Sequence, residues 1–318
     1  MSQIDWLSHL LQMINITGQL EVRCAYGAPW RVAWPQSAAH EIPYHVVLNG
    51  RAIIEDPELK TARELVGGDI VLLPHGSAHV LHDGSGRTPS HTYSRQSSAG
   101  WMVRENDGQG ERLDMLCGRF FIGPPYDRLI RGYLPTNLVV RASDGHGEEG
   151  IGSASNHLAS LVGLMRTESA GDRLGGYAIL NALTSALFTL ALRAASESEQ
   201  PPAGLLALTG HPRLAPAISA MFADPARPWT LPDLADLCSM SRATFMRHFQ
   251  DKLGRSALEL LTDIRMSLAA NELKKPAMTT EAVAELVGYQ SVAAFRRVFT
   301  DKMGMTPGQW RRSARESQ

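Results

Sequence analysis

Two arginines, Arg247 and Arg297, occupy equivalent positions in two stretches of the chain that are similar in sequence. The stretch 241–249 reads Ser-Arg-Ala-Thr-Phe-Met-Arg-His-Phe, and the stretch 291–299 reads Ser-Val-Ala-Ala-Phe-Arg-Arg-Val-Phe. A guanidinium can form two hydrogen bonds with the edge of one guanine in the major groove of DNA, and it can also bind a phosphate. The repeated arginine therefore indicates nucleic-acid recognition, with an ordinary solvated helix face as the alternative.

Each stretch forms the second helix of a predicted helix-turn-helix unit. In the first unit, 230–249, apolar residues recur at helical spacing after Thr230, a favourable N-cap, and Ser241 caps the second helix. In the second unit, 279–299, Gly288 supplies the turn and Ser291 caps the second helix. The aromatic residues of both second helices are expected in the core: Phe245, Phe249, Phe295 and Phe299.

One long helix is predicted between the two units. Apolar residues recur at helical spacing over 256–273, without an internal glycine or proline. At about 1.5 Å per residue this helix spans roughly 27 Å. With the width of the flanking units, it could hold two recognition helices about 34 Å apart, which is one turn of DNA. A single chain could then enter two successive major grooves.

This region resembles the DNA-binding domain of the AraC/XylS family of bacterial transcription regulators. The one departure is Ser256-Ala257, where the family usually has Ser-Pro. The motifs that carry the resemblance, in order and spacing, are Ser241–Phe249, Leu253–Ser256, Arg265–Ala269, Ala284–Tyr289, Phe295–Phe299 and Gly304–Arg311.

The resemblance implies which residues face the DNA groove. Alanine and valine can only touch a thymine methyl group or leave space, so base reading is expected to fall on Arg247 and Arg297. The implied groove-facing positions are Arg242, Ala243, Met246 and Arg247 in the first unit, and Val292, Ala293, Arg296 and Arg297 in the second.

Charge and composition agree with a DNA-binding role for the last part of the chain. From His211 onward the chain has fifteen Lys and Arg residues and eleven Asp and Glu residues, which gives a net charge of +4. The first 210 residues have a net charge of −5. DNA affinity should therefore include a phosphate contribution that weakens with salt. The chain has no run of about eighteen apolar residues and no secretory pattern at 1–11, so we expect a cytoplasmic protein without membrane attachment. Its three cysteines are too few for a disulfide scaffold.

Many short strands are predicted between Leu20 and Val140, where short apolar runs alternate with turn residues. Such a pattern indicates a β-sandwich or barrel. The run Gly68–His79 resembles the second motif of cupin barrels, and Val46–Gly50 resembles the end of the first, which implies a cupin-like barrel at about 15–142. Within it, Asp83–Gly110 has few aliphatic residues and is expected to be a long loop.

Two helices are predicted after the barrel, within about 153–196. The second carries a leucine stripe that could pack within the chain or against a second subunit, and the resemblance to cupin-containing AraC-type regulators favours a homodimer. We therefore expect a two-domain α+β protein, with a sensor and dimerisation domain at 1–204 and an all-α double helix-turn-helix domain at 205–318. The stripe is Leu180, Leu183, Leu187 and Leu190.

A metal site in the barrel would need His45, His75, His79 or His82 as ligands. The first cupin motif lacks its His-x-His pair, because 35–41 reads Pro-Gln-Ser-Ala-Ala-His-Glu. We therefore expect no metal, no cofactor and no enzymatic activity. A metal-dependent cupin enzyme fused to DNA-binding helices is the alternative.

Cys24 and Cys117 suggest a redox input. Among cupin-containing AraC-type regulators, the chain resembles those that sense reactive chlorine or other oxidants, in which cysteines occur near these two places. A thiol pair on adjacent strands could be oxidised to a disulfide. The competing hypothesis is a small organic effector held at the barrel mouth by Tyr44, His45 and His79. We expect a sequence-specific transcription regulator, in the first place an activator, whose partners are double-stranded DNA, RNA polymerase and a second copy of the chain.

Overall fold

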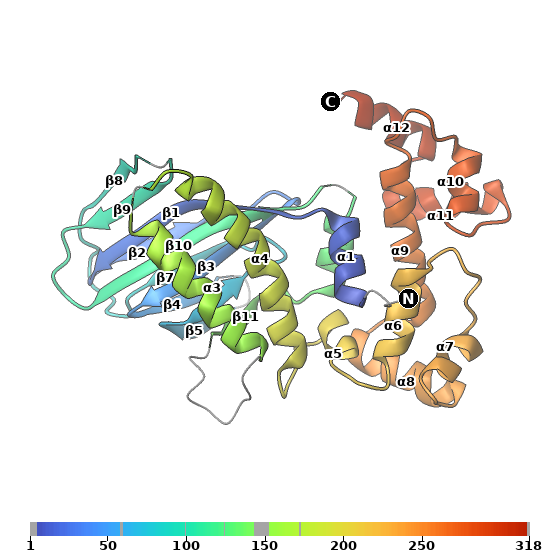
Figure 1. Cartoon of the computed structure of the whole chain (residues 1–318), viewed down its shortest axis with the longest axis horizontal. Coiled ribbons are helices and arrows are strands. Elements are labelled where there is room, and N and C mark those ends of the chain that lie inside the picture. Colours follow the sequence, from blue (N-terminus) through green and yellow to red (C-terminus); the bar gives the residue numbers. More distant parts are fainter. Residues whose placement is uncertain are drawn as a thin grey trace. The chain divides into compact units, whose positions relative to one another are not determined.

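Strands fill the first part of the chain and helices the last part in the computed structural model (Figure 1). The structure describes residues 5–57, 60–98, 100–123, 125–142, 153–171 and 173–316. Parts of the predicted domains, residues 1–4, 143–152 and 317–318, lie outside these ranges.

The chain divides into two compact units, each built from separate segments of sequence. The sheet unit comprises Ile16–Ile122 and Pro135–Pro202. The helical unit comprises Met1–Asn15, Gly123–Leu134 and Ala203–Gln318. The expected domain boundary after residue 204 lies near the last of these junctions, but two segments that precede it in sequence belong to the helical unit.

Two sheets enclose the core of the sheet unit, so the expected closed barrel is an open arrangement of a seven-stranded and a four-stranded sheet. The larger sheet has the order β11-β6-β3-β10-β1-β9-β8, and the smaller has the order β2-β7-β4-β5. Buried side chains from both sheets form one cluster, among them Val22, Val47, Val71 and Leu81. The strands are β1 (Thr17–Gly27), β2 (Arg31–Trp34), β3 (Glu41–Asn49), β4 (Arg51–Asp56), β5 (Thr61–Val66), β6 (Asp69–Leu72), β7 (His79–His82), β8 (Thr92–Gln96), β9 (Met102–Asn106), β10 (Arg112–Phe121) and β11 (Leu138–Arg141).

The prediction of a long loop at 83–110 is wrong. Two strands, β8 and β9, lie within it, and β9 pairs in parallel with β1, where Val22 faces Met102 and Cys24 faces Arg104. All five residues of β8 are exposed, so its strand conformation comes from hydrogen bonding to β9 and not from buried apolar side chains. Composition alone could not reveal this pairing.

Helix α4 (Gly176–Glu197) completes the hydrogen bonding of β1. Because β9 pairs with β1 only from Val22 onward, the backbone N–H groups of Gly18 and Leu20 need other acceptors. The Gly18 N–H donates to Ser185 Oγ at 2.9 Å, and the Leu20 N–H donates to Asn181 Oδ1 at 3.1 Å. By length and composition alone α4 could cross a membrane, but here it packs on the sheet and on α3 (Ala154–Ser169).

The predicted caps Thr230, Ser241 and Ser291 and the predicted helices of both helix-turn-helix units are confirmed. Their side chains, and also those of Ser256 and Thr279, each accept a hydrogen bond from the backbone N–H three residues later. The helices are α1 (Trp6–Ile14), α2 (Asp127–Tyr133), α5 (Leu205–Thr209), α6 (Ala215–Ala223), α7 (Leu231–Leu237), α8 (Arg242–Leu253), α9 (Ala257–Glu272), α10 (Thr280–Leu286), α11 (Val292–Met303) and α12 (Pro307–Glu316).

Arg265 of α9 ties the two helix-turn-helix units together. Its guanidinium donates to the carbonyl oxygens of Pro225 at 2.6 Å and Arg227 at 2.8 Å, in the loop before α7. The same group lies 5.9 Å from the ring centroid of Tyr289, in the turn of the second unit. The spacing of the two units therefore depends on side-chain contacts as well as on the length of α9.

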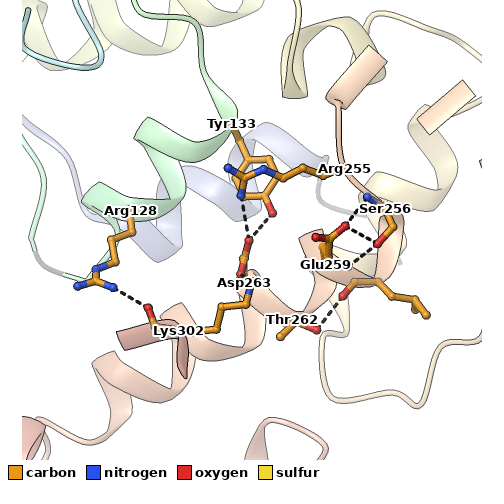
Figure 2. A network of polar contacts seen from close by, with 9 residues as sticks. Arg128, Tyr133, Arg255, Ser256, Glu259, Thr262, Asp263 and Lys302 are labelled. Carbon is orange, nitrogen blue, oxygen red and sulfur yellow. Dashed lines mark hydrogen bonds and ion pairs between the residues drawn. The ribbon is translucent and has the colours of Figure 1, made fainter. Parts of the chain in front are cut away.

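Helix α2 is held on α9 by a polar network centred on Asp263, shown in Figure 2. The Tyr133 hydroxyl donates to the Asp263 carboxylate, and Lys302 Nζ lies 2.8 Å from the same group. Arg128 donates to the carbonyl oxygens of Lys302 and Met303 at the end of α11. A short helix between β10 and β11 is thus anchored to the helix that joins the two helix-turn-helix units.

Gly288 offers a test of the close packing between the two helix-turn-helix units. Its φ is +80°, and a Cβ there would lie 2.1 Å from the carbonyl oxygen of Ala226. We expect Gly288→Ala to cost the left-handed backbone penalty of about 1–2 kcal/mol, plus about 1–3 kcal/mol for the clash. The measurement is the urea midpoint of the full chain followed by circular dichroism.

Gly304→Ala is the matched control. Gly304 has a φ of +74° but nothing within 4 Å of its Cβ position, so only the backbone penalty applies. Equal losses of stability in the two variants would contradict the close approach at Ala226.

Candidate DNA-binding surface and thiol–histidine cluster

The outward faces of α8 and α11 carry the residues expected to face DNA. Phe245 and Phe249 of α8, and Phe295 and Phe299 of α11, are fully buried, so the opposite face of each helix points to solvent. The exposed residues there are Arg242, Ala243, Met246 and Arg247 on α8, and Ala293, Arg296 and Arg297 on α11, with Val292 half-buried.

The arginines of these faces differ in their partners. Arg296 pairs with Glu281 of α10 at 3.0 Å. The guanidinium groups of Arg242, Arg247 and Arg297 make no hydrogen bond or ion pair with any residue that the structure describes. Their guanidinium groups are therefore available for phosphate or base contacts without first breaking an ion pair.

In the sheet unit, Cys24 and Cys117 lie on neighbouring strands and face the same core. Strands β1 and β10 run antiparallel, with Val22 opposite Cys117 and Cys24 opposite Met115. The two cysteines are thus diagonal neighbours on one face of the strand pair. Both thiols are free and buried.

Cys117 begins a chain of hydrogen-bonded side chains that runs through two histidines. Its Sγ lies 3.0 Å from Nδ1 of His45, which sits directly opposite on β3. Nε2 of His45 lies 2.7 Å from Nε2 of His79 on β7, and Nδ1 of His79 lies 2.8 Å from the carbonyl oxygen of Ser77. Trp34 of β2 stacks on His79, with their rings 6° from parallel.

Burial controls the protonation of these groups. It lowers the pKa of His45 well below its ordinary value, with the neighbouring His79 adding to the shift, and it also lowers the pKa of His79. Burial raises the pKa of Cys117 well above the ordinary value. The adjacent Cys117 thiol, and to a lesser degree Tyr26 and Arg104, lower the pKa of the Cys24 thiol despite its burial.

Tyr44 does not join the predicted effector site with His45 and His79. It lies on the opposite face of β3, where its hydroxyl contacts Thr184 of α4 at 3.1 Å and its ring packs on Phe120. Successive strand residues point to opposite faces, so neighbours in sequence could not share one site here. The effector hypothesis placed Tyr44 on the wrong side of the sheet.

The four candidate metal ligands are not brought together. His82 lies on the outer face of β7 with Glu55 at 3.2 Å, and His75 lies in the preceding turn. His45 and His79 approach more closely than the about 3.3 Å expected of two nitrogens bound to one tetrahedral zinc ion. Among the described residues, no group of three or more His, Cys, Asp or Glu could hold a metal.

Arg104 is a residue of this cluster that sequence reasoning missed. It faces Cys24 in the parallel register of β1 and β9, and its side chain makes no hydrogen bond or ion pair with any residue in the described part of the chain. No sequence signal could have found it, because its strand was predicted as a loop.

Comparison with known proteins gives both units a family. The sequence profile described as Cupin matches residues 5–197, more than half of the chain, and a profile described as Helix-turn-helix domain matches residues 234–313. The chain therefore belongs to the cupin-containing AraC-type transcription regulators.

Full-length relatives agree with this assignment. The RCS-specific HTH-type transcriptional activator RclR of Escherichia coli is 29% identical over 98% of this chain and 99% of its own length. The HTH-type transcriptional regulator MtrA of Neisseria gonorrhoeae is 29% identical over 97% of this chain and 98% of its own length. The crystal structure of ToxT from Vibrio cholerae aligns over 93% of this chain and 96% of its own at 14% identity, with a TM-score of 0.35.

The regulator thus has DNA as its partner through the helical unit, and it is not an enzyme, as the sequence predicted. The similarity to RclR is consistent with the predicted resemblance to reactive-chlorine-responsive regulators. In this cupin-containing AraC-type regulator, the sheet unit carries the thiol–histidine cluster.

The buried histidines predict that acid destabilises this regulator. Unfolded histidine has a pKa of about 6.5, so below that pH the unfolded chain binds protons that folded His45 and His79 do not. Stability is therefore lost as the pH falls, by up to about 1.4 kcal/mol per pH unit for each histidine. The check is the urea midpoint of the native chain and of His45→Gln between about pH 7.5 and about pH 5.5.

His45→Gln should show a smaller loss than the native chain over this range, and His91→Gln, which removes an exposed histidine, should match the native chain. An identical pH slope in all three proteins would show that His45 can be protonated in the folded state.

Proposed function

We propose that this regulator is a cytoplasmic transcription activator that reads its operator through Arg247 and Arg297 and is switched by oxidation of Cys24 and Cys117. The observation that carries the proposal is the diagonal placement of the two thiols on the central strand pair β1–β10. RclR, which is similar to this chain over its whole length, is described as an RCS-specific activator. That description fits both an oxidant as the signal and activation as the effect on transcription.

Two recognition helices on one chain explain how the operator is read. Arg247 and Arg297 occupy equivalent exposed positions and lack partners within the described residues, whereas Arg296 is engaged by Glu281. We therefore assign base contacts to the first two, and phosphate or positioning contacts to Arg242 and Arg296. The small side chains at Ala243 and Ala293 let each helix approach the bases, with Met246 and Val292 beside them for apolar contacts.

Oxidation joins the two thiols in a balanced step. Hypochlorous acid converts one thiol to a sulfenyl chloride and water, and the second sulfur displaces chloride to form the disulfide. Together, two thiols and one hypochlorous acid give one disulfide, water, chloride and one proton. The two sulfur atoms lose two electrons, and chlorine gains them.

Disulfide formation should move β10. Diagonal neighbours on antiparallel strands have Cα atoms about 7–8 Å apart, whereas a disulfide requires about 4.4–6.8 Å. Strand β10 ends at Phe121 and the chain continues into α2, which is anchored to Asp263 of α9. We propose that the strand shift is transmitted along this connection to the two helix-turn-helix units.

Helices α3 and α4 supply the dimer contact in this proposal. Leu164 is 59% exposed and Ile179 is 45% exposed, although most apolar residues of the sheet unit are buried. A second copy would cover them. Activation then requires contact between the DNA-bound dimer and RNA polymerase.

Alanine substitutions test the DNA-reading assignment. Arg247→Ala and Arg297→Ala should each weaken operator binding by about 1–3 kcal/mol, roughly 5- to 150-fold in Kd, and relax base preference at one position. The operator is first selected from genomic fragments with the full chain, and Kd is then measured by fluorescence anisotropy on operator variants.

Arg87→Ala, in an exposed loop of the sheet unit, is the control and should bind as the native chain does. A uniform loss across all operator variants, with a smaller salt slope, would mean that these arginines contact phosphate instead of bases.

Serine substitutions test the redox input. Cys24→Ser and Cys117→Ser should each abolish oxidant-induced transcription from the operator, because neither can form the disulfide, while Cys238→Ser should respond normally. Non-reducing peptide mass spectrometry should find Cys24 linked to Cys117 only after oxidant exposure.

A normal response in both single variants would instead favour a small organic effector. The cavity beside His45 and His79 measures about 110 Å³, well below the about 300–1,000 Å³ of ordinary ligand pockets, which weighs against that alternative.

A further inference from the structure

We propose that His45 and His79 form a proton relay that takes the thiol proton of Cys117 as the disulfide forms. This inference rests on the proposed redox function and assigns a chemical role to two residues of the sensor. It is carried by the unbroken chain of contacts from Cys117 Sγ through both imidazoles to Ser77.

The direction of every hydrogen bond in this chain follows from its last member. The carbonyl oxygen of Ser77 can only accept, so Nδ1 of His79 carries a hydrogen and Nε2 of the neutral ring is an acceptor. Nε2 of His45 must then donate to His79, which leaves Nδ1 of neutral His45 as an acceptor. The only hydrogen that can occupy the 3.0 Å contact at Nδ1 is the thiol hydrogen of Cys117. In the reduced protein the donors therefore all point from Cys117 toward Ser77.

This arrangement suits Cys117 as the sulfur that attacks. Cys24 lies opposite Arg104 of β9, whose positive charge favours the Cys24 thiolate, so we assign to Cys24 the first reaction with hypochlorous acid. Cys117 has a neutral base aimed at its thiol instead. The surroundings of Cys24 thus suit the sulfur that is oxidised first and becomes the electrophile. The surroundings of Cys117 suit the sulfur that then attacks as the nucleophile.

The relay moves one proton by one step along the chain as the disulfide forms. The Cys117 sulfur attacks the sulfenyl chloride at Cys24, the new S–S bond forms, and chloride departs with the electron pair of the S–Cl bond. The thiol proton passes to Nδ1 of His45, while the proton on Nε2 of His45 passes to Nε2 of His79. His45 ends neutral with its proton on the other nitrogen, and His79 ends as an imidazolium.

The proton can leave from His79. Both histidines line a small cavity together with Trp34, Glu21, Glu41 and Arg119, so charged groups and water can receive it there. Trp34, which stacks on His79, leaves its own Nε1 without a partner among the described residues, consistent with a position for water in this cavity. The negative charge of Asp56 also favours the charged form of His79.

The test is the rate of Cys24–Cys117 disulfide formation in the full chain after one equivalent of hypochlorous acid. Rapid acid quenching and peptide mass spectrometry follow the reaction in the native chain, His45→Gln and His79→Gln. We expect His45→Gln to slow the reaction about 100-fold, as for loss of a general base, and His79→Gln to slow it less because the first acceptor remains. The final disulfide yield should be unchanged.

A pH profile separates proton transfer from simple repacking. Between about pH 7 and about pH 9 the native rate should stay nearly constant, whereas the His45→Gln rate should rise about tenfold per pH unit, because only the thiolate can then attack. His82→Gln is the control: it lies on the same strand but on the outer face, and should behave as the native chain. Equal rates and equal pH profiles in the native chain and His45→Gln would overturn the relay.

Nitrogen-15 NMR of histidine-labelled protein tests the bond directions independently of oxidation. Reduced native protein should show hydrogen on Nε2 of His45 and on Nδ1 of His79, and the opposite tautomers would refute the relay even if the disulfide forms. A native chain that forms no Cys24–Cys117 disulfide would refute the redox function, and the relay with it, so the two failures are distinguishable.

Discussion

The strand pair β1–β10 is the constraint on which the thiol–histidine cluster depends. Its inner face holds Cys24 and Cys117, and its outer face holds α4, whose side chains satisfy the free N–H groups of β1. Gly118 allows this double packing, because a Cβ there would lie 2.1 Å from the carbonyl oxygen of Gln19 and 2.7 Å from the hydroxyl of Tyr44. Strand β10 is therefore packed on both faces. A change in the bonding of Cys117 would strain this strand, and the neighbouring side chains leave no space in which the strain could relax.

Burial gives the thiol–histidine cluster its chemistry. A low dielectric keeps both imidazoles neutral, and only a neutral imidazole can accept a proton. The same burial shields the thiols from solvent. Under the proposed function, the oxidants that reach them are therefore small and uncharged, so selectivity for a class of oxidant and loss of the Cys117 proton have one physical origin. Burial alone would make Cys117 a poor nucleophile without His45 beside it.

The helical unit could be predicted closely from sequence, because its signals are local. A Ser or Thr cap such as Ser241 or Ser256 fixes a helix start within three residues, and the phenylalanine pairs mark the buried faces. The sheet unit could be predicted only as a class, because strand pairing joins distant segments. The β1–β9 pair, and with it the place of Arg104, and the separation of Tyr44 from His45 depend on register and on which face is buried, and neither can be read from composition.

The anchoring of α2 had no sequence signal, since its partner Asp263 lies 130 residues beyond Tyr133. Asp263 is only 16% exposed and has contacts from three segments: Tyr133 of α2, Arg255 before α9, and Lys302 near the end of α11. Under the proposed function, a pull on α2 removes one of these partners from a largely buried carboxylate. Because such a group is costly to leave short of hydrogen bonds, the remaining two cations must move to compensate. One of them is on the helix that bears Arg297, so a displacement that begins at a cysteine strand ends as a change in how the second recognition helix meets DNA.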